Sequence, residues 1–345
     1  MGLLKNRPSK QGKKGVPVWF MRQAGRYHSH YQNIKKDSNF MEMCKNPDLA
    51  CEITMGPIND FDFDAAILFS DLLFPLERLG LGLSYESGPP TLEHHLHAPK
   101  DLEKLHTQKN VTYDFQGQAC ASIRKALPKS KDLLGFTGAP FTLYAYACEG
   151  AHSGGLINAK QGLHSGLYDR FLALIEAEII DQLSIQAASG SDGLCLFDTA
   201  AGELSLDDYT QFVIPSIKRV TQALKKKFPS TSIIYYSKLT HLNYLQRLEC
   251  PAIDVLGVDW RVDLKEALST LGKDYTIQGN LDPAHLFLPW PLLQQKLETI
   301  FKHASDSKYG PDKWIMGLGH GVMQNTPEEN VKNAVRFIHD NFLYR

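Results

Sequence analysis

The sequence predicts an α/β protein built as a single (β/α)₈ barrel, a TIM barrel, with elaborated loops at the carboxyl ends of its strands. Three observations predict this fold. Eight short apolar runs recur along the 345 residues, each is followed by a stretch of helical periodicity, and most are continuously apolar rather than alternating. Continuous apolar runs are typical of parallel strands that are buried on both faces. An open doubly wound sheet is the alternative, but it usually has fewer strands.

The eight runs give the predicted strands in order. They are Val16–Met21, Ala65–Ser70, Leu133–Thr137, Gly193–Asp198, Ser232–Ser237, Val255–Trp260, Thr276–Asn280 and Trp314–Gly319. Helices are predicted between them at Asp48–Asp60, around Ile123, and at Leu167–Ala188, Leu206–Lys227, Leu239–Glu249, Leu264–Leu271, Pro283–His303 and Pro327–Asn341. Asp282 and Thr326 each precede a proline and are expected to cap the last two helices.

The connections between the first four strands are long, so elaborate loops are expected in the first half of the chain. No linker composition interrupts the pattern, and residues 1–345 are therefore predicted to form one domain. The first 15 residues contain five basic side chains together with Pro8, Gly12 and Gly15. This composition favours a flexible basic tail over an interaction arm.

Composition excludes several classes of protein. The net charge is −1, so no general attraction to nucleic acid or to a membrane surface is expected. The longest uncharged run, Leu133–Cys148, is shorter than the ~20 apolar residues of a membrane span. Six cysteines without zinc-site spacing indicate buried thiols in a reducing compartment. No secretory signal pattern opens the sequence, so we expect a cytoplasmic protein.

Catalytic groups of a barrel lie at the carboxyl ends of its strands, and polar residues cluster at these ends here. Arg22 and Arg26 follow the first strand, and two arginines beside Gly25 in an apolar context favour anion capture over a solvated face. Asp71 follows the second strand, where it could also cap a helix or pair with an arginine. Tyr146 could be a core residue, and His320 lies between two glycines that would allow a ligand close to the backbone.

Other polar residues near the strand ends favour structural roles. Asp198 and Asp259 are expected to form hydrogen bonds inside the barrel. The cluster His94, His95 and His97 lies in a predicted loop and is interpreted as surface decoration rather than a metal site.

The strand ends together resemble one family, the uroporphyrinogen decarboxylases. The order and spacing of the motifs match from about residue 16 to the end of the chain. The segments that carry the resemblance are Pro17–Tyr27 (with RQAGRY), Phe69–Asp71 (FSD), Gly135–Leu143 (GFTGAPFTL), Gln278–Pro283 (QGNLDP) and Leu318–Gly321 (LGHG).

The resemblance implies a cofactor-free barrel, without a metal, that forms a homodimer and acts on a small molecule. It implies substrate contacts from Arg22, Gln23, Ala24, Gly25, Arg26, Asp71, Tyr146, Thr199 and His320. The chain departs from the family pattern at Thr199 (commonly Ser), Leu239 (Gly), Gly317 (Asn) and Gln324 (Pro). None of these departures removes an expected catalytic group.

The chemistry of this family explains the residue types. Its substrate carries four acetates and four propionates on a cyclic tetrapyrrole, and each acetate becomes a methyl group with loss of CO₂. Guanidinium forks bind such carboxylates in a bidentate manner. A protonated pyrrole accepts the electrons that CO₂ leaves behind, so no cofactor is needed. Asp71 is the candidate that stabilises the positive ring, and Arg22, or a water that it orients, is the candidate proton source.

Two alternatives come from other functional classes. Zinc-dependent methyltransferases of the same superfamily need a thiolate-bearing site, commonly His-x-Cys with a distant Cys, and the sequence contains no His-x-Cys. A tetrapyrrole carrier without activity is the second alternative, but binding an octacarboxylate would not favour an anion at Asp71.

Overall fold

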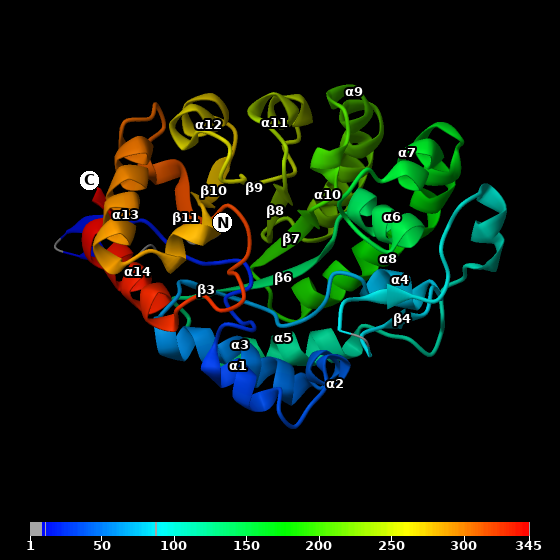
Figure 1. Ribbon diagram of the computed structural model, residues 1–345, viewed down its shortest axis with the longest axis horizontal. Helices are drawn as coiled ribbons and strands as arrows, with labels where there is room; N and C mark the ends of the chain where they lie inside the picture. Colours follow the sequence, from blue (N-terminus) through cyan, green and yellow to red (C-terminus); the bar gives the residue numbers. More distant parts are fainter. Residues whose placement is uncertain (1–8, 11, 87, 345) are drawn as a thin grey trace.

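Seven parallel strands form a curled sheet in which successive strands lie side by side (Figure 1). The computed structural model describes residues 9–10, 12–86 and 88–344. The strands run in the order β11 (Trp314–Leu318), β10 (Thr276–Leu281), β9 (Val255–Gly257), β8 (Ser232–Ser237), β7 (Gly193–Asp198), β6 (Asp132–Gly138) and β3 (Ala65–Ile67). The predicted barrel architecture is thereby confirmed, with the predicted limits of β7 and β8 unchanged.

The eighth position of the barrel is filled by an irregular segment, residues 16–21. Val18 forms a single parallel bridge with Met316 of β11, and its carbonyl accepts a hydrogen bond from Asp64 N at 2.9 Å, next to β3. The segment therefore closes the barrel between its two edge strands. A regular strand at Val16–Met21 was the wrong expectation. Pro17 has no N–H for a ladder, and the N–H of Phe20 donates to the side chain of Gln23 instead.

Two apolar layers explain why the strands have no polar face. One layer fills the barrel itself and includes Trp19, Phe136, Cys195 and Tyr236. The other lies between the strands and the surrounding helices and forms the larger core. A strand that contacts both layers is buried on both faces, which produces the continuous apolar runs seen in the sequence.

Helices surround the strands (Figure 1). They include α3 (Pro47–Phe61), α5 (Asp114–Ala126), α8 (Leu167–Ala188), α11 (Leu242–Leu248), α12 (Leu264–Leu271) and α14 (Glu328–Asn341). Predicted helices at Leu167–Ala188 and Leu264–Leu271 agree residue for residue. Thr326 does not cap α14, whose N-cap is Pro327, whereas Asp282 accepts a hydrogen bond from Ala284 N at 2.9 Å as expected.

Prolines divide two predicted helices. The segment Leu206–Lys227 consists of α9 (Leu206–Asp208), the π-helical turn η3 (Tyr209–Val213) and α10 (Ile214–Lys227), with Pro215 in the first turn of α10. The segment Pro283–His303 is divided by Pro289 into η4 (Pro283–Phe287) and α13 (Trp290–Ser305). Because proline lacks an N–H, it is accommodated most easily at the start of a helix, as Pro215 and Pro289 are here.

The long loops of the first half contain further elements, as their length suggested. These are α1 (Ser29–Ile34), α2 (Phe40–Lys45), α4 (Phe74–Arg78), the hairpin β4 (Leu83–Ser84) and β5 (Thr91–Leu92), η1 (Pro99–Lys104), α6 (Pro140–Glu149) and α7 (Ile157–His164). The short turns η2 (Ala201–Glu203) and η5 (Pro311–Lys313) lie in the second half. Within the described ranges, no helix combines the length and apolarity of a membrane span.

The basic N-terminal segment is ordered where the structure describes it. Strands β1 (Ser9–Lys10), β2 (Lys13–Gly15) and β12 (Leu343–Tyr344) form an antiparallel sheet, and Val16 N donates to Phe342 O at 2.9 Å. The structure therefore differs from the expected flexible tail at residues 13–15, which pair with the C-terminal strand β12, and at residues 9–10, which pair with β2. Residues 1–8 and 11 lie outside the described residues.

Candidate active site

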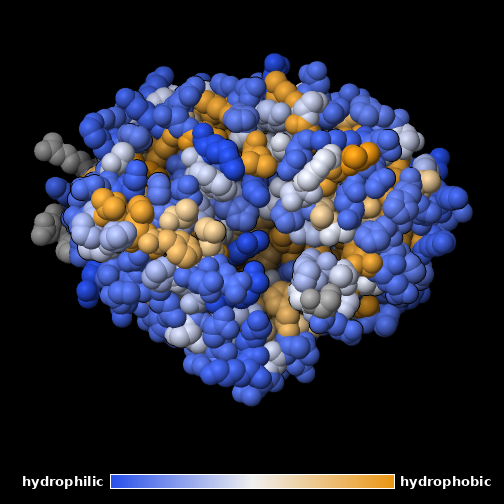
Figure 2. All heavy atoms as spheres, in the orientation of Figure 1, coloured by the Kyte–Doolittle hydropathy of each residue, from blue (hydrophilic) through white to orange (hydrophobic). Residues whose placement is uncertain are grey.

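The carboxyl ends of parallel strands meet at one end of a barrel, and the site residues come from the loops that follow them. Figure 2 shows a hollow near the centre of the face that the loop after β11 crosses in Figure 1. Hydrophilic and hydrophobic residues both border this hollow. Residues from several loops meet at this end of the barrel. The charge of Arg22 lowers the pKa values of Tyr146, His152 and His320. The charge of Asp71 raises the pKa of Tyr146, and that of Lys238 lowers the pKa values of both histidines.

Arg22 lies at the centre of this group. Its backbone is left-handed, with φ 62°, which is an uncommon conformation for a residue with a side chain. Val322 N donates to Met21 O at 2.8 Å, so the loop after β11 is tied to the residue before Arg22. Desolvation lowers the pKa of Arg22, and Arg26 lowers it further, whereas Tyr146 and Asp71 act in the opposite direction.

The other residues of the first motif divide into structural and exposed ones. Gln23 is buried, and its side chain donates to Ala65 O at 2.9 Å and accepts from Phe20 N at 3.2 Å. These bonds anchor the motif to β3 and leave the Gln23 amide engaged with the backbone. Arg26 is exposed, and Ala24 and Gly25 are half-buried beside it.

Asp71 follows β3 and is held by two kinds of hydrogen bond. Leu73 N donates to its Oδ1 at 2.8 Å, and the hydroxyl of Tyr85, from the hairpin β4–β5, donates to the carboxylate. Burial raises the pKa of Asp71, although both hydrogen bonds oppose the rise. Among the described residues, no arginine or lysine forms an ion pair with Asp71. Asp71 is therefore a desolvated carboxylate that a positive charge on a ligand could approach.

Tyr146 lies on α6 and contacts a histidine that the sequence motifs did not single out. Its hydroxyl lies 2.7 Å from Nδ1 of His152, and the two rings are 5.3 Å apart. Burial raises the pKa of Tyr146 to about 12, and the charge of Asp71 contributes to the rise. His152 comes three residues after the end of α6, so only its place in the fold reveals it.

Asp198 and Asp259 form hydrogen bonds inside the barrel, as predicted. Asp198 accepts from Thr142 Oγ1 at 2.7 Å and from Tyr235 at 3.0 Å, and burial raises its pKa to about 6. The next residue, Thr199, is buried at the end of β7.

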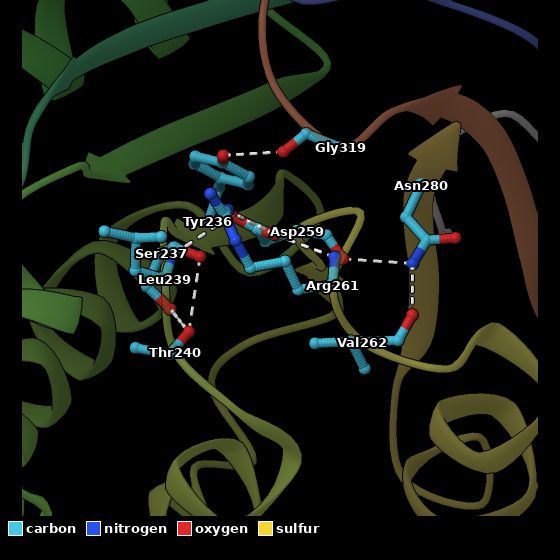
Figure 3. Close-up of polar contacts among 9 residues, drawn as sticks. All are labelled: Tyr236, Ser237, Leu239, Thr240, Asp259, Arg261, Val262, Asn280 and Gly319. Carbon is cyan, nitrogen blue, oxygen red and sulfur yellow. Dashed lines mark hydrogen bonds and ion pairs between the residues drawn. The ribbon is translucent and has the colours of Figure 1, made fainter. Parts of the chain in front are cut away.

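Figure 3 shows the corresponding arrangement around Asp259. Its carboxylate accepts from Arg261, at 2.9 Å for the closer oxygen, and from Leu239 N at 3.2 Å. The carbonyl of Asp259 accepts from the side chain of Asn280 at 3.0 Å. These contacts hold the ends of β9 and β10 together with the segment that follows β8.

His320 follows β11 and faces the same group of charges. Tyr236 donates to Gly319 O at 2.7 Å and fixes the backbone before the histidine (Figure 3). Burial lowers the pKa of His320 to about 3, and the nearby charges of Arg22 and Lys238 act in the same direction. Its buried Nε2 has no hydrogen-bond partner within the part of the chain that the structure describes. His320 is therefore a neutral imidazole with one ring nitrogen that no described protein group satisfies.

Comparison with known proteins identifies the family. The family model described as "Uroporphyrinogen decarboxylase (URO-D)" matches residues 8–341. The chain is 35% identical to the uroporphyrinogen decarboxylase of Solibacter usitatus, over 94% of this chain and 93% of that protein. It is 36% identical to that of Roseiflexus sp., over 94% of each. The chain belongs to the uroporphyrinogen decarboxylase family.

A solved structure shares the fold of this uroporphyrinogen decarboxylase family member at low sequence identity. A methyltransferase from Methanosarcina mazei superposes with a TM-score of 0.76 at 17% identity, and covers 98% of this chain and 96% of its own. This likeness shows the fold alone. Among the described residues, no group of three His, Cys, Asp or Glu side chains is arranged to hold a metal, and His94, His95 and His97 form no such group.

Gly317, where many uroporphyrinogen decarboxylases carry Asn, lies in β11 opposite Asn280. A Cβ at Gly317 would lie 2.0 Å from Nε2 of Gln278 and 3.1 Å from Trp19 O. A side chain at this position would therefore have to displace the end of the Gln278 side chain and would press against the backbone of Trp19. Gln324 is exposed in the loop beyond His320.

Proposed function

We propose that this family member is a carboxy-lyase that converts the four acetate groups of uroporphyrinogen III to methyl groups. The products are coproporphyrinogen III and four CO₂, in tetrapyrrole biosynthesis. The observation that carries the proposal is the desolvated carboxylate of Asp71, which forms no ion pair with a lysine or arginine among the described residues and lies within electrostatic reach of Arg22 and Tyr146.

Asp71 has the properties that the reaction requires. Loss of CO₂ needs an electron acceptor, and a pyrrole becomes one when a ring carbon is protonated. The positive charge then spreads to the ring nitrogen, and a carboxylate stabilises it most strongly where water is excluded. Asp71 would therefore bind the protonated ring more strongly than the neutral one, which lowers the barrier.

Arg22 is the candidate for the proton source, directly or through a water that it orients. Desolvation and the neighbouring Arg26 both lower the pKa of Arg22, which makes proton donation easier than from a guanidinium with its ordinary pKa. Arg26 would bind a carboxylate with its planar fork. Tyr146, Thr199 and His320 would orient the remaining carboxylates, and Ala24 and Gly25 would offer their backbone.

The proposed reaction needs neither metal nor cofactor, because the protonated substrate accepts its own electrons. The alternative, a zinc-dependent methyltransferase, would need a thiolate in the site. Cys195 is buried in the barrel interior, and burial raises its pKa above the usual range. That environment disfavours the thiolate that zinc requires.

Anaerobic incubation with uroporphyrinogen III tests the proposal directly. Chromatography of the oxidised products should show intermediates with seven, six and five carboxylates, and coproporphyrin as the end product. Unchanged uroporphyrin after prolonged incubation with folded protein would contradict the proposed activity. Methyl transfer to a thiol would instead support the alternative.

The family resemblance also supports a homodimer in the cytoplasm. Sedimentation at micromolar concentration should give about twice the 38.7 kDa mass of the chain. The six cysteines are free thiols, as suits a reducing compartment. A fully active monomer would contradict a functional dimer.

A further inference from the structure

His152 lies in the turn that follows α6, and this turn brings its side chain back against that helix. Gly150 and Gly154 flank it with φ of 68° and 91°, left-handed conformations that reverse the chain after α6. The turn places Nδ1 of His152 2.7 Å from the hydroxyl of Tyr146. This distance is typical of a strong hydrogen bond.

The groups that face His152 come from four parts of the fold. They are Tyr146 on α6, Arg22 after the first segment, Lys238 after β8 and His320 after β11. Burial lowers the pKa of His152, and the charges of Lys238 and Arg22 add to the effect. The imidazole is therefore neutral while the site is empty.

The hydrogen bond with Tyr146 is linked to the tautomer of His152, because a phenolic hydroxyl can donate or accept. When the tyrosine hydroxyl donates to Nδ1, the proton of the neutral imidazole lies on Nε2. Among the described residues, no hydrogen bond to Nε2 is formed within the protein. The Nε2–H group can therefore donate to an anion that enters between Arg22 and Lys238.

An arriving carboxylate reverses the electrostatic environment of the ring. Two cations disfavour the imidazolium, whereas an anion at hydrogen-bond distance favours it. With a second proton, Nδ1–H donates to the oxygen of Tyr146, and the tyrosine hydroxyl becomes free to donate to another carboxylate. Solvent supplies this proton, and no covalent bond of the ligand changes.

We propose that His152 is a substrate-binding residue that donates to a substrate carboxylate and takes up a proton from solvent when that carboxylate binds. The proposal rests on the proposed function, since it needs a ligand with several carboxylates. It extends that function because the affinity of the site becomes coupled to pH through a residue outside the family motifs.

Calorimetric titration with coproporphyrinogen III under nitrogen tests the proposal. Measurements in two buffers of different ionisation enthalpy, at pH 7, give the number of protons taken up per site. His152→Gln can still hydrogen-bond Tyr146 but cannot take up a proton. We expect less proton uptake and about tenfold weaker binding, as for the loss of a hydrogen bond to a charged group. His303→Gln, at an exposed position of α13, should match the wild type.

The outcomes separate this proposal from the proposed function. A wild type that binds without proton uptake overturns the role of His152, as does a folded His152→Gln protein with unchanged uptake. His152→Asn, with the same readouts, provides a second variant if the glutamine lowers the melting temperature. A wild type that binds with His152-dependent uptake but does not decarboxylate uroporphyrinogen III overturns the reaction and retains the anion-linked histidine. Absence of binding by the wild type overturns both.

Discussion

Gly321 packs directly against the side chain of Arg22, with no space between them for a methyl group. A Cβ at Gly321 would lie 2.4 Å from Cδ and 2.7 Å from Cγ of Arg22. The loop after β11 therefore packs against the aliphatic part of the Arg22 side chain and restricts where this side chain can lie. The close contact with Arg22, a residue almost 300 positions earlier in the chain, thus explains why the second residue after Leu318-Gly319 in the LGHG motif, Gly321, is a glycine.

Gly321→Ala should displace Arg22 and reduce activity. Overpacking of this kind costs ~1–3 kcal/mol, so the melting temperature should fall by several degrees. The larger effect should be on kcat/KM, because the guanidinium moves. Gly155→Ala is the matched control, since its Cβ would meet only Ile157 Cγ1, at 3.6 Å. Equal activity of the two variants would show that Arg22 tolerates the shift.

Asp71→Asn should fold and bind but turn over slowly. Opposite charges ~4 Å apart at an effective dielectric of ~20 interact by about 4 kcal/mol, which corresponds to roughly a thousandfold in rate. The raised pKa of Asp71 means that the folded protein holds its proton more tightly than the unfolded chain. Its charge therefore costs stability once the pH rises through the folded pKa.

Asp71→Asn should accordingly melt no lower than the wild type at pH 8. Turnover, binding of coproporphyrinogen III and melting temperature, measured on one preparation, separate catalysis from stability. A destabilised variant with near wild-type turnover per folded molecule would assign Asp71 a purely structural role.

Arg26→Lys should lower kcat/KM although the charge is kept. Lysine cannot form the bidentate contact, and a charged hydrogen bond contributes ~1.5–3 kcal/mol, or about 10- to 150-fold. Arg247→Lys, at an exposed position of α11, is the control. Initial rates with uroporphyrinogen III measure both, and indistinguishable variants would place Arg26 outside the substrate contacts.

His320→Gln should change the dependence of stability on pH. The pKa of His320 is lowered to about 3 in the folded protein, so the unfolded chain binds the proton more tightly. The wild type therefore loses stability as the pH falls from about 6.5, the ordinary value of histidine, toward 3. Melting temperatures between pH 7 and 4 should fall less steeply in the variant, and parallel curves would contradict a neutral His320.

Exhaustive dialysis against a chelator should leave the activity unchanged, because the proposed substrate supplies its own electron acceptor. Metal content by mass spectrometry and turnover on the same sample check this prediction. Stoichiometric zinc, with activity lost on its removal and restored on its return, would favour the methyltransferase alternative.

The sequence predicted correctly those elements whose local apolar pattern agrees with their burial in the folded protein. Strands β7 and β8 contact apolar layers on both faces, so their apolar runs coincide with their limits. The prediction of a strand at Val16–Met21 was wrong although the segment is apolar. Pro17 has no N–H to donate, and the N–H of Phe20 donates to the side chain of Gln23 rather than to a neighbouring strand. Short elements such as β4 and β5 were missed because two-residue strands carry no periodicity.

The candidate site likewise contains residues that the sequence indicated and contacts that only the fold reveals. Motifs indicated Arg22, Asp71, Tyr146 and His320, which the fold brings to one end of the barrel. The use of the Gln23 side chain to anchor the motif depends on a bond to Ala65, 42 positions away, which no local pattern reveals. His152 was missed because a histidine in a glycine-rich loop acquires meaning only from the side chain that it contacts.

Barrel closure through Val18 and Met316 also determines when the protein can complete its fold during synthesis. These residues are about 300 positions apart, and a ribosome that adds ~5–20 residues per second needs roughly 15–60 s between them. Throughout that interval the edge at β3 and the first segment lack their final neighbour. A nascent chain of this length exposes unpaired backbone and apolar surface to other chains. We therefore expect early termination before β11 to produce insoluble fragments, and chaperone demand to end only when the last strand has left the ribosome.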